Sequence, residues 1–149
     1  MPFLAAAVLL AFFFGQAGAQ PTIPAETAIR DALMSWARQF NGGKADEVCG
    51  LFAADLRYDY RGFPERGFGE ICGLLRRSLN DRTKHYSYSL QINEIIVSGD
   101  LAVVRLIWRL EIVSAGTAAG TVSEEPGIDI FRKQPDGGWK IIRYIAYEN

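Results

Sequence analysis

The segment LAVVRLIWRLEIV, residues 101–113, restricts the fold more than any other part of this chain. Its apolar side chains recur at every second position, and Arg105, Arg109 and Glu111 stand between them. This period of two predicts a long β-strand with one buried face, because successive side chains of a strand point to opposite sides. The predicted buried face consists of Ala102, Val104, Leu106, Trp108, Leu110 and Ile112.

Further strands are predicted on both sides of this one. YSYSLQI alternates in the same way, and the alternation then slips between Ile92 and Ile95, which predicts a β-bulge that bends the sheet. GIDIFRKQPDGGWKIIRY, residues 127–144, predicts two strands around a tight turn at Asp136–Gly138. SAGTAAGT, residues 114–121, has the composition of a flexible loop within one domain.

The first half of the chain carries helical signals instead. Apolar residues at helical spacing predict a first helix over 26–40, a shorter second helix over 45–53 and a third over 68–79. Between the last two, DLRYDY alternates and places Tyr58 and Tyr60 on one face of a strand. Helices followed by an antiparallel sheet predict an α+β fold in which three N-terminal helices pack on one sheet face.

The N-terminus has the pattern of a signal peptide. FLAAAVLLAFFFG, residues 3–15, is uncharged and too short for a comfortable bilayer span, which needs about 20 residues. A small-x-small cleavage site, Ala17-Gly18-Ala19, follows it. We therefore expect residues 1–19 to be removed and 20–149 to form one exported domain, periplasmic or secreted, with no stable membrane anchor after cleavage. The alternative is a buried N-terminal helix.

Composition narrows the classes of function. The 149 residues carry a formal net charge of −1, so no broad basic field attracts nucleic acid or anionic lipid. Phosphate-loop, dinucleotide and zinc-spacing motifs are absent from the sequence, and no cofactor or metal is predicted. The single histidine, His85, is expected to be solvated at the start of a strand, and one histidine does not build a metal site.

Because we expect the domain to be exported, the two cysteines, Cys49 and Cys72, have two possible interpretations. A disulfide between them would stabilise the fold by about 3 kcal/mol in the chain-entropy model. Alternatively, they are two small buried apolar side chains whose sulfur atoms never meet. The sequence does not give the Cα separation that a bridge requires, so both interpretations stay open. Neither cysteine has a nearby histidine in the sequence, which argues against a nucleophilic thiol.

Three segments in this order resemble the nuclear transport factor 2-like superfamily, in particular its SnoaL-like and ketosteroid-isomerase-like branch. They are FNGGKADEVCGLFAADLRYDY after the first helix, VSGDLAVVRLIWRL, and IDIFRKQPDGGWKI near the end. The resemblance covers nearly all of residues 25–148. It implies a cone, in which a strongly curved antiparallel sheet wraps three helices and opens over an apolar pocket. It also implies a homodimer through the convex sheet face.

The resemblance assigns a role to Asp129, an acid set between isoleucines. Asp129 matches the position where ketosteroid isomerases keep a protonated acid that donates a hydrogen bond to the substrate oxyanion. The catalytic tyrosine of the family falls on Trp36, and the proton-abstracting acid falls on Tyr60. Because tryptophan does not titrate and tyrosine has a pKa near 10, steroid isomerisation by that mechanism is not expected.

Strand parity gives the other candidate side chains of the pocket. Arg143 shares the parity of Trp139 and Ile141, so it is expected to point inward near Asp129. There it would either form a buried ion pair with Asp129 or bind a ligand carboxylate. The outer face would carry Ile128, Ile130, Ile142 and Tyr144. The ligand-binding candidates are Trp36, Tyr58, Trp108, Phe131, Arg143 and Tyr147.

Three functions follow from these observations. The first, which we favour, is an exported domain that binds a small hydrophobic or carboxylate ligand in an apolar pocket. The second is an isomerase, lyase or hydrolase for a hydrophobic carbonyl compound, with Asp129 as hydrogen-bond donor and Tyr60 as the other catalytic candidate. The third is a non-catalytic dimerisation or association domain. The sequence does not decide whether the domain is an enzyme, because one fold of this kind hosts many functions.

Overall fold

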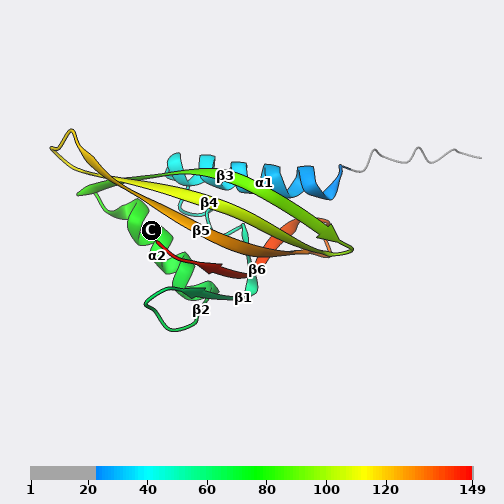
Figure 1. Cartoon of the computed structure of the whole chain (residues 1–149). Coiled ribbons are helices and arrows are strands. Elements are labelled where there is room, and N and C mark those ends of the chain that lie inside the picture. Colours follow the sequence, from blue (N-terminus) through cyan, green and yellow to red (C-terminus); the bar gives the residue numbers. More distant parts are fainter. Residues whose placement is uncertain (1–22, 149) are drawn as a thin grey trace, which may run out of the picture.

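A computed structural model of the chain describes residues 23–148. In this part, two helices pack on one six-stranded sheet (Figure 1). The helices are α1, Ala25–Asn41, and α2, Phe68–Asn80, which confirms the first and third predicted helices within one residue at each end. The strands are β1 Phe52–Tyr60, β2 Arg66–Gly67, β3 Lys84–Ser98, β4 Leu101–Ser114, β5 Gly120–Lys133 and β6 Trp139–Ala146.

The sheet runs in the order β2-β1-β6-β5-β4-β3. All neighbouring strands are antiparallel except β1 and β6, which are parallel, so the sheet is mixed rather than purely antiparallel as expected. Figure 1 shows α1 running alongside β3, and α2 lying beside the short strands β1 and β2. The α+β architecture, with helices covering one face of a curved sheet, is confirmed.

The predicted second helix is wrong, because residues 45–51 form consecutive turns. The carbonyl oxygen of Val48 accepts a hydrogen bond of 2.7 Å from the indole Nε1 of Trp36. In a helix that carbonyl would bind the amide of Phe52, which instead donates to the carbonyl of Cys49 at 3.1 Å. The long-range bond from α1 therefore replaces a helical bond, and β1 begins directly at Phe52.

Three irregularities interrupt the pairing of the strands, one of them between Phe52 and Arg57 of β1 where it pairs with β6. The pairing of β3 with β4 shifts between Ile92 and Glu94, which confirms the predicted bulge. The third shift, which the sequence analysis did not predict, lies between β5 and β6, where Ile142 has no partner. An extra residue in one strand reverses the inward and outward positions beyond it. The predicted faces of β6 are therefore wrong after Ile142.

The inner face of β4 changes character along its length. Ala102, Val104 and Leu106 are at most 2% exposed and pack in the core. Trp108 and Leu110, on the same face, are only partly buried. The predicted apolar face is thus correct, but only its first half lies in a solid core. Its second half borders open space, which contains the candidate site.

The two cysteines form a disulfide, with their Cα atoms 5.5 Å apart. Cys49 precedes β1 and Cys72 lies in α2, so the bridge fastens this helix to the sheet. Their separation of 23 residues corresponds to about 3 kcal/mol in the chain-entropy model. The predicted signal peptide, residues 1–19, lies outside the described residues. Among the described helices, none has the length and apolar character needed to cross a membrane.

Candidate functional site

A cavity of about 590 Å³ lies between the inner face of the sheet and the two helices. Its walls come from both helices and from every strand, and α2 contributes Ile71, Leu74 and Leu75. The interior predicted from the resemblance is therefore hollow. Half of the remaining lining residues are aromatic: Trp36, Phe40, Phe52, Tyr58, Tyr60, Phe63, Tyr86, Tyr88, Trp108 and Tyr144.

Strand pairing brings three polar side chains into one row on the cavity wall. Tyr58 of β1 pairs with Tyr144 of β6, and Tyr144 pairs with Asp129 of β5. Neighbouring strands are about 4.8 Å apart, so the three side chains are adjacent. The two tyrosine rings are stacked, with centroids 4.3 Å apart and planes 15° apart. We call Tyr58, Tyr144 and Asp129 the polar row.

In the next row of residues across the sheet, only the first residue has a large side chain. Tyr60 of β1 is followed across the sheet by Ala146 of β6 and Gly127 of β5. A Cβ atom on Gly127 would stand 2.8 Å from the carbonyl oxygen of Ile145, so the close approach of β6 requires glycine. The lack of bulky side chains at Gly127 and Ala146 leaves open space beside the polar row.

Asp129 is the buried acid that the resemblance indicates. Its side chain is 4% exposed, and Oδ2 has no hydrogen-bond partner among the described residues. Burial raises the pKa of Asp129 from 3.8 to about 7, because desolvation disfavours the charged form. The acid therefore keeps its proton in mildly acidic solution and can donate a hydrogen bond into the cavity.

The tyrosines of the polar row supply further hydroxyl groups. Tyr58 is 3% exposed, and its hydroxyl has no hydrogen-bond partner in the described part of the chain. Burial raises the pKa of Tyr144 far above its usual value, and the nearby Tyr58 and Asp129 raise it further. Tyr144 therefore remains a neutral phenol. The row offers donors but no cation, so it suits an uncharged acceptor such as a carbonyl oxygen.

The expected inward position of Arg143 is wrong. Its side chain is exposed, and Nη1 donates hydrogen bonds to the carbonyl oxygens of Asp55, at 3.0 Å, and Ile142, at 2.6 Å. The bulge at Ile142 is the cause, since it turns Arg143 outward and Tyr144 inward. Arg143 consequently neither pairs with Asp129 nor reaches the cavity.

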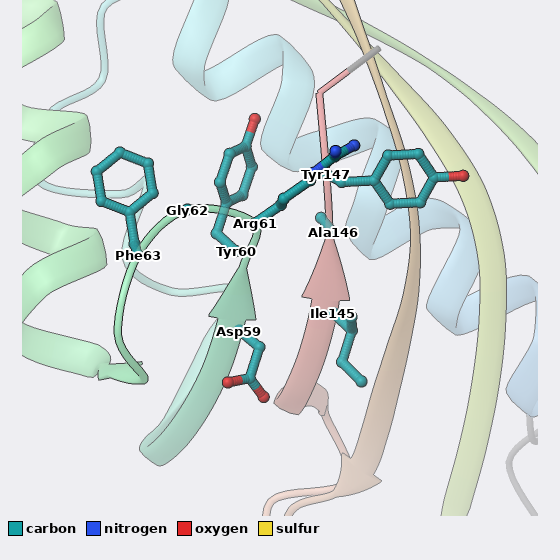
Figure 2. A pocket seen from close by; sticks show the side chains of 8 residues that line it. All are labelled: Asp59, Tyr60, Arg61, Gly62, Phe63, Ile145, Ala146 and Tyr147. Atoms are coloured by element: carbon teal, nitrogen blue, oxygen red, sulfur yellow. The ribbon is translucent and has the colours of Figure 1, made fainter.

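Tyr147 also lies outside the cavity, for the same reason. It is 42% exposed and lines a separate shallow hollow of about 460 Å³, where β1 and β6 end (Figure 2). In Figure 2 the Tyr147 ring extends away from Tyr60 and Phe63. Tyr60, Phe63 and Ala146 border both spaces, so they form the lip between the outer hollow and the cavity.

The remaining candidates lie where the sequence placed them, with one exception. Trp36 and Trp108 line the cavity, and their rings meet edge to face with centroids 5.0 Å apart. The indole N–H of Trp36 is already bonded, so this ring offers only apolar surface. Phe131 is wholly buried in the core and is not part of the cavity lining. His85 is exposed, as expected.

Among the cavity residues that the sequence analysis missed, Glu125 and Tyr144 matter most for the chemistry of the site. Glu125 shares the inward parity of Asp129 on β5, so alternation alone would have found it. It is half-buried, and burial is the main cause of its raised pKa, which Tyr60 lowers and Glu148 raises. Tyr144 carried no such signal, because the bulge that turns it inward is not visible in the apolar pattern. Within residues 23–148, no three metal-binding side chains of His, Cys, Asp or Glu gather.

Comparison with known proteins identifies the family. The family model of the SnoaL-like domain matches residues 21–145, so the chain belongs to this family. No curated protein matches it. The fold, with its helix-covered curved sheet, is that of the nuclear transport factor 2-like proteins, which confirms the resemblance drawn from the sequence.

Three solved structures illustrate this fold. A ketosteroid isomerase-like protein from Erwinia carotovora atroseptica superposes with a TM-score of 0.66 and 21% identity, over 82% of this chain and 94% of its own. An NTF2-like protein with a cystatin-like fold from Novosphingobium aromaticivorans gives 0.64 and 23%, over 82% and 80%. A protein from Catenulispora acidiphila, in complex with S-DNPA, gives 0.67 and 13%, over 83% and 92%. At these identities the likeness concerns the fold.

The raised pKa of Asp129 predicts how stability depends on pH. The folded protein holds this proton up to about pH 7, whereas the unfolded chain releases it near 3.8. The wild type should therefore lose stability as pH rises between these values, by up to about 4 kcal/mol. Asp129→Asn removes the titration, so the variant should match the wild type near pH 4 and exceed it at pH 8 in urea unfolding.

Asp31→Asn is the matched control for this measurement, because Asp31 is an exposed acid on α1. It should follow the pH dependence of the wild type. A wild-type protein that gained stability across the same pH window, or an Asp129→Asn variant that was less stable at pH 8, would show that the acid is ionised and paired.

Proposed function

We propose that this domain binds a small hydrophobic molecule that carries a carbonyl group or a similar hydrogen-bond acceptor. The observation that supports this most directly is Asp129, which lines the cavity although its Oδ2 atom has no hydrogen-bond partner among the described residues. A buried polar group without a partner costs about 1–3 kcal/mol. A ligand oxygen that accepts a hydrogen bond from Asp129 would offset part of this cost.

The size and composition of the cavity agree with this proposal. A volume of about 590 Å³ lies within the range of about 300–1,000 Å³ that is usual for sites of small molecules. Aromatic walls supply most of the contact area, and the polar row fixes the orientation of the ligand. The structure of similar fold from Catenulispora acidiphila, solved in complex with S-DNPA, supports ligand binding as a use of this fold.

A second candidate function is catalysis on a hydrophobic carbonyl compound, by an isomerase, a lyase or a hydrolase. It is favoured by the neutral acid Asp129, since a buried carboxylic acid can stabilise an oxyanion that forms in the transition state. Tyr60 does not act as the base in this proposal. Burial and the nearby carboxylates of Glu125 and Glu148 raise its pKa further above the usual value.

Export is part of the proposal. The apolar segment before Ala19 is followed by a cleavage pattern, and the disulfide between Cys49 and Cys72 suits an oxidising compartment. The mature domain would then begin at Gln20. Intact mass spectrometry of the protein from periplasm or culture medium should show the chain without residues 1–19, whereas full-length protein in the cytoplasm would contradict this.

A homodimer through the outer face of the sheet is also proposed. Ile128 and Ile145 are 47% and 63% exposed and are paired across β5 and β6. Exposed apolar patches of this kind mark interfaces. Opposite charges flank the two isoleucines, so two copies related by a two-fold axis can place Arg105 near Asp59. The complete row across the sheet consists of Glu94, Arg105, Ile128, Ile145 and Asp59.

The carbonyl proposal predicts a preference that depends on the protonation of Asp129. At pH 5.5 the wild type should bind 2-acetylnaphthalene about tenfold more tightly than 2-ethylnaphthalene, because only the ketone accepts a hydrogen bond. The preference should disappear at pH 8.5, where Asp129 is ionised, and in Asp129→Leu at both pH values. Isothermal titration calorimetry measures it, with Asp31→Asn as control. Equal affinities at pH 5.5 would reject Asp129 as the donor.

The dimer proposal predicts the effect of charge at the centre of the outer face. Ile128→Lys combined with Ile145→Lys should yield a monomer in light scattering, because like charges would face each other across the two-fold axis. Ile96→Lys is the control, since Ile96 is exposed but lies on the edge strand β3. A monomeric wild type, or a dimer that survives both substitutions, would contradict the proposal.

A further inference from the structure

We infer that the cavity has a second polar end, formed by Glu125, and that its ligand is an elongated molecule with a hydrogen-bond acceptor at one end and a hydroxyl donor at the other. This inference rests on the proposed function, because it places the acceptor of the ligand at Asp129. It adds the shape of the ligand and the chemistry of its opposite end.

The spacing of the two ends follows from one strand. Glu125, Gly127 and Asp129 lie on the same face of β5, and all three line the cavity. Four residues along a strand correspond to roughly 13 Å between the Cα atoms of Glu125 and Asp129. Because Gly127 has no side chain, nothing from β5 fills the space between the two acids. A flat body can therefore lie over Gly127 and Ala146 and reach both.

The surroundings of Glu125 favour a donor as its partner. Its carboxylate forms no ion pair with any described lysine or arginine, and its nearest titratable neighbours are Tyr60 and Glu148. A second acid disfavours an anionic ligand group at this end. The phenol of Tyr60 approaches Glu125. Because a carboxylate has about four acceptor sites, Glu125 can still accept a hydrogen bond from a ligand in the cavity.

Two cations, Arg66 and Arg77, also line the cavity. Arg66 belongs to β2, and its guanidinium lies over the ring of Phe63 at 4.1 Å from the centroid. Arg77 belongs to α2, and its Nη1 would lie 3.1 Å from a Cβ atom built on Gly73. Arg66 is thus held at the lip and Arg77 along the helix, and neither forms an ion pair with Glu125. We therefore expect the hydroxyl end of the ligand to bind Glu125 on β5.

The flanking residues fit an aromatic body. Trp108 of β4 pairs with Glu125, and both Trp108 and Tyr88 of β3 line the cavity. The rings of these two residues meet edge to face with centroids 5.8 Å apart. Leu74 of α2 faces the same space and is 43% exposed. A planar ring system between them would bury apolar surface on both of its faces.

Three probes with one biphenyl body test this inference: 4-acetylbiphenyl, 4-acetyl-4′-hydroxybiphenyl and 4-acetyl-4′-methoxybiphenyl. All three present the acetyl oxygen to Asp129, but only the hydroxyl compound offers a donor to Glu125. At pH 5.5 the wild type should bind the hydroxyl compound about tenfold more tightly than the methoxy compound, because only the hydroxyl group donates a hydrogen bond to Glu125. Calorimetric titration gives the three dissociation constants.

Three variants, at Glu125 and at its neighbour Glu124, test whether Glu125 causes this preference. Glu125→Leu should abolish the preference for the hydroxyl compound over the methoxy compound. Glu124→Leu is the control, because Glu124 is the exposed neighbour of Glu125 and pairs with Arg109 on the other face. It should keep the preference. Glu125→Gln should retain part of it, since an amide oxygen also accepts a hydrogen bond.

The results that would contradict this inference differ from those that would contradict the proposed function. Equal affinity for the hydroxyl and methoxy compounds, with all three probes bound, would overturn this inference and leave the proposed function intact. A preference that survives Glu125→Leu would also overturn it. Absence of binding by every probe to the folded wild type would overturn the inference together with the proposed function.

Discussion

A single unpaired residue in β6, Ile142, determines what the cavity contains. Without this bulge, strict alternation would point Arg143 toward Asp129 and Tyr144 toward solvent. The cavity would then hold an ion pair, and Asp129 would be an occupied anion. With the bulge, the cation is outside, Tyr144 stacks on Tyr58, and Asp129 has no charged partner. The neutral donor character of the polar row therefore originates in the backbone of a neighbouring strand.

The fold was predictable from the sequence where the pattern is carried by many residues. Two helices, the bulge near Ile92 and the long strand 101–113 agree with their predictions, because each rests on several side chains with one period. The helix predicted over 45–53 is absent because of one hydrogen bond, from Trp36 to the carbonyl of Val48, that no local pattern encodes. Long-range hydrogen bonds of this kind override a short apolar run.

The candidate site was less predictable, and for a related reason. Asp129 was found because an acid between isoleucines is unusual, and its burial follows from alternation. Arg143 and Tyr147 were placed wrongly, because one extra residue in a strand exchanges its two faces without changing its composition. Glu125 was overlooked although its parity was readable, since it stands near Pro126 and outside the most apolar part of β5. Sequence patterns thus predict which polar side chains are present more reliably than they predict which of these side chains lie next to one another.

Burial of Asp129 links the stability of the domain to its use. The desolvation that keeps the acid protonated also destabilises the empty fold at neutral pH, where the unfolded chain is free to ionise. A packed apolar residue would avoid this cost, and so would an inward Arg143. The disulfide and the core around Ala102, Val104 and Leu106 supply the stability that such a group requires. A ligand that accepts a hydrogen bond from Asp129 would offset the same cost on binding. The group that destabilises the domain without a ligand is therefore the one that stabilises its complex with a ligand.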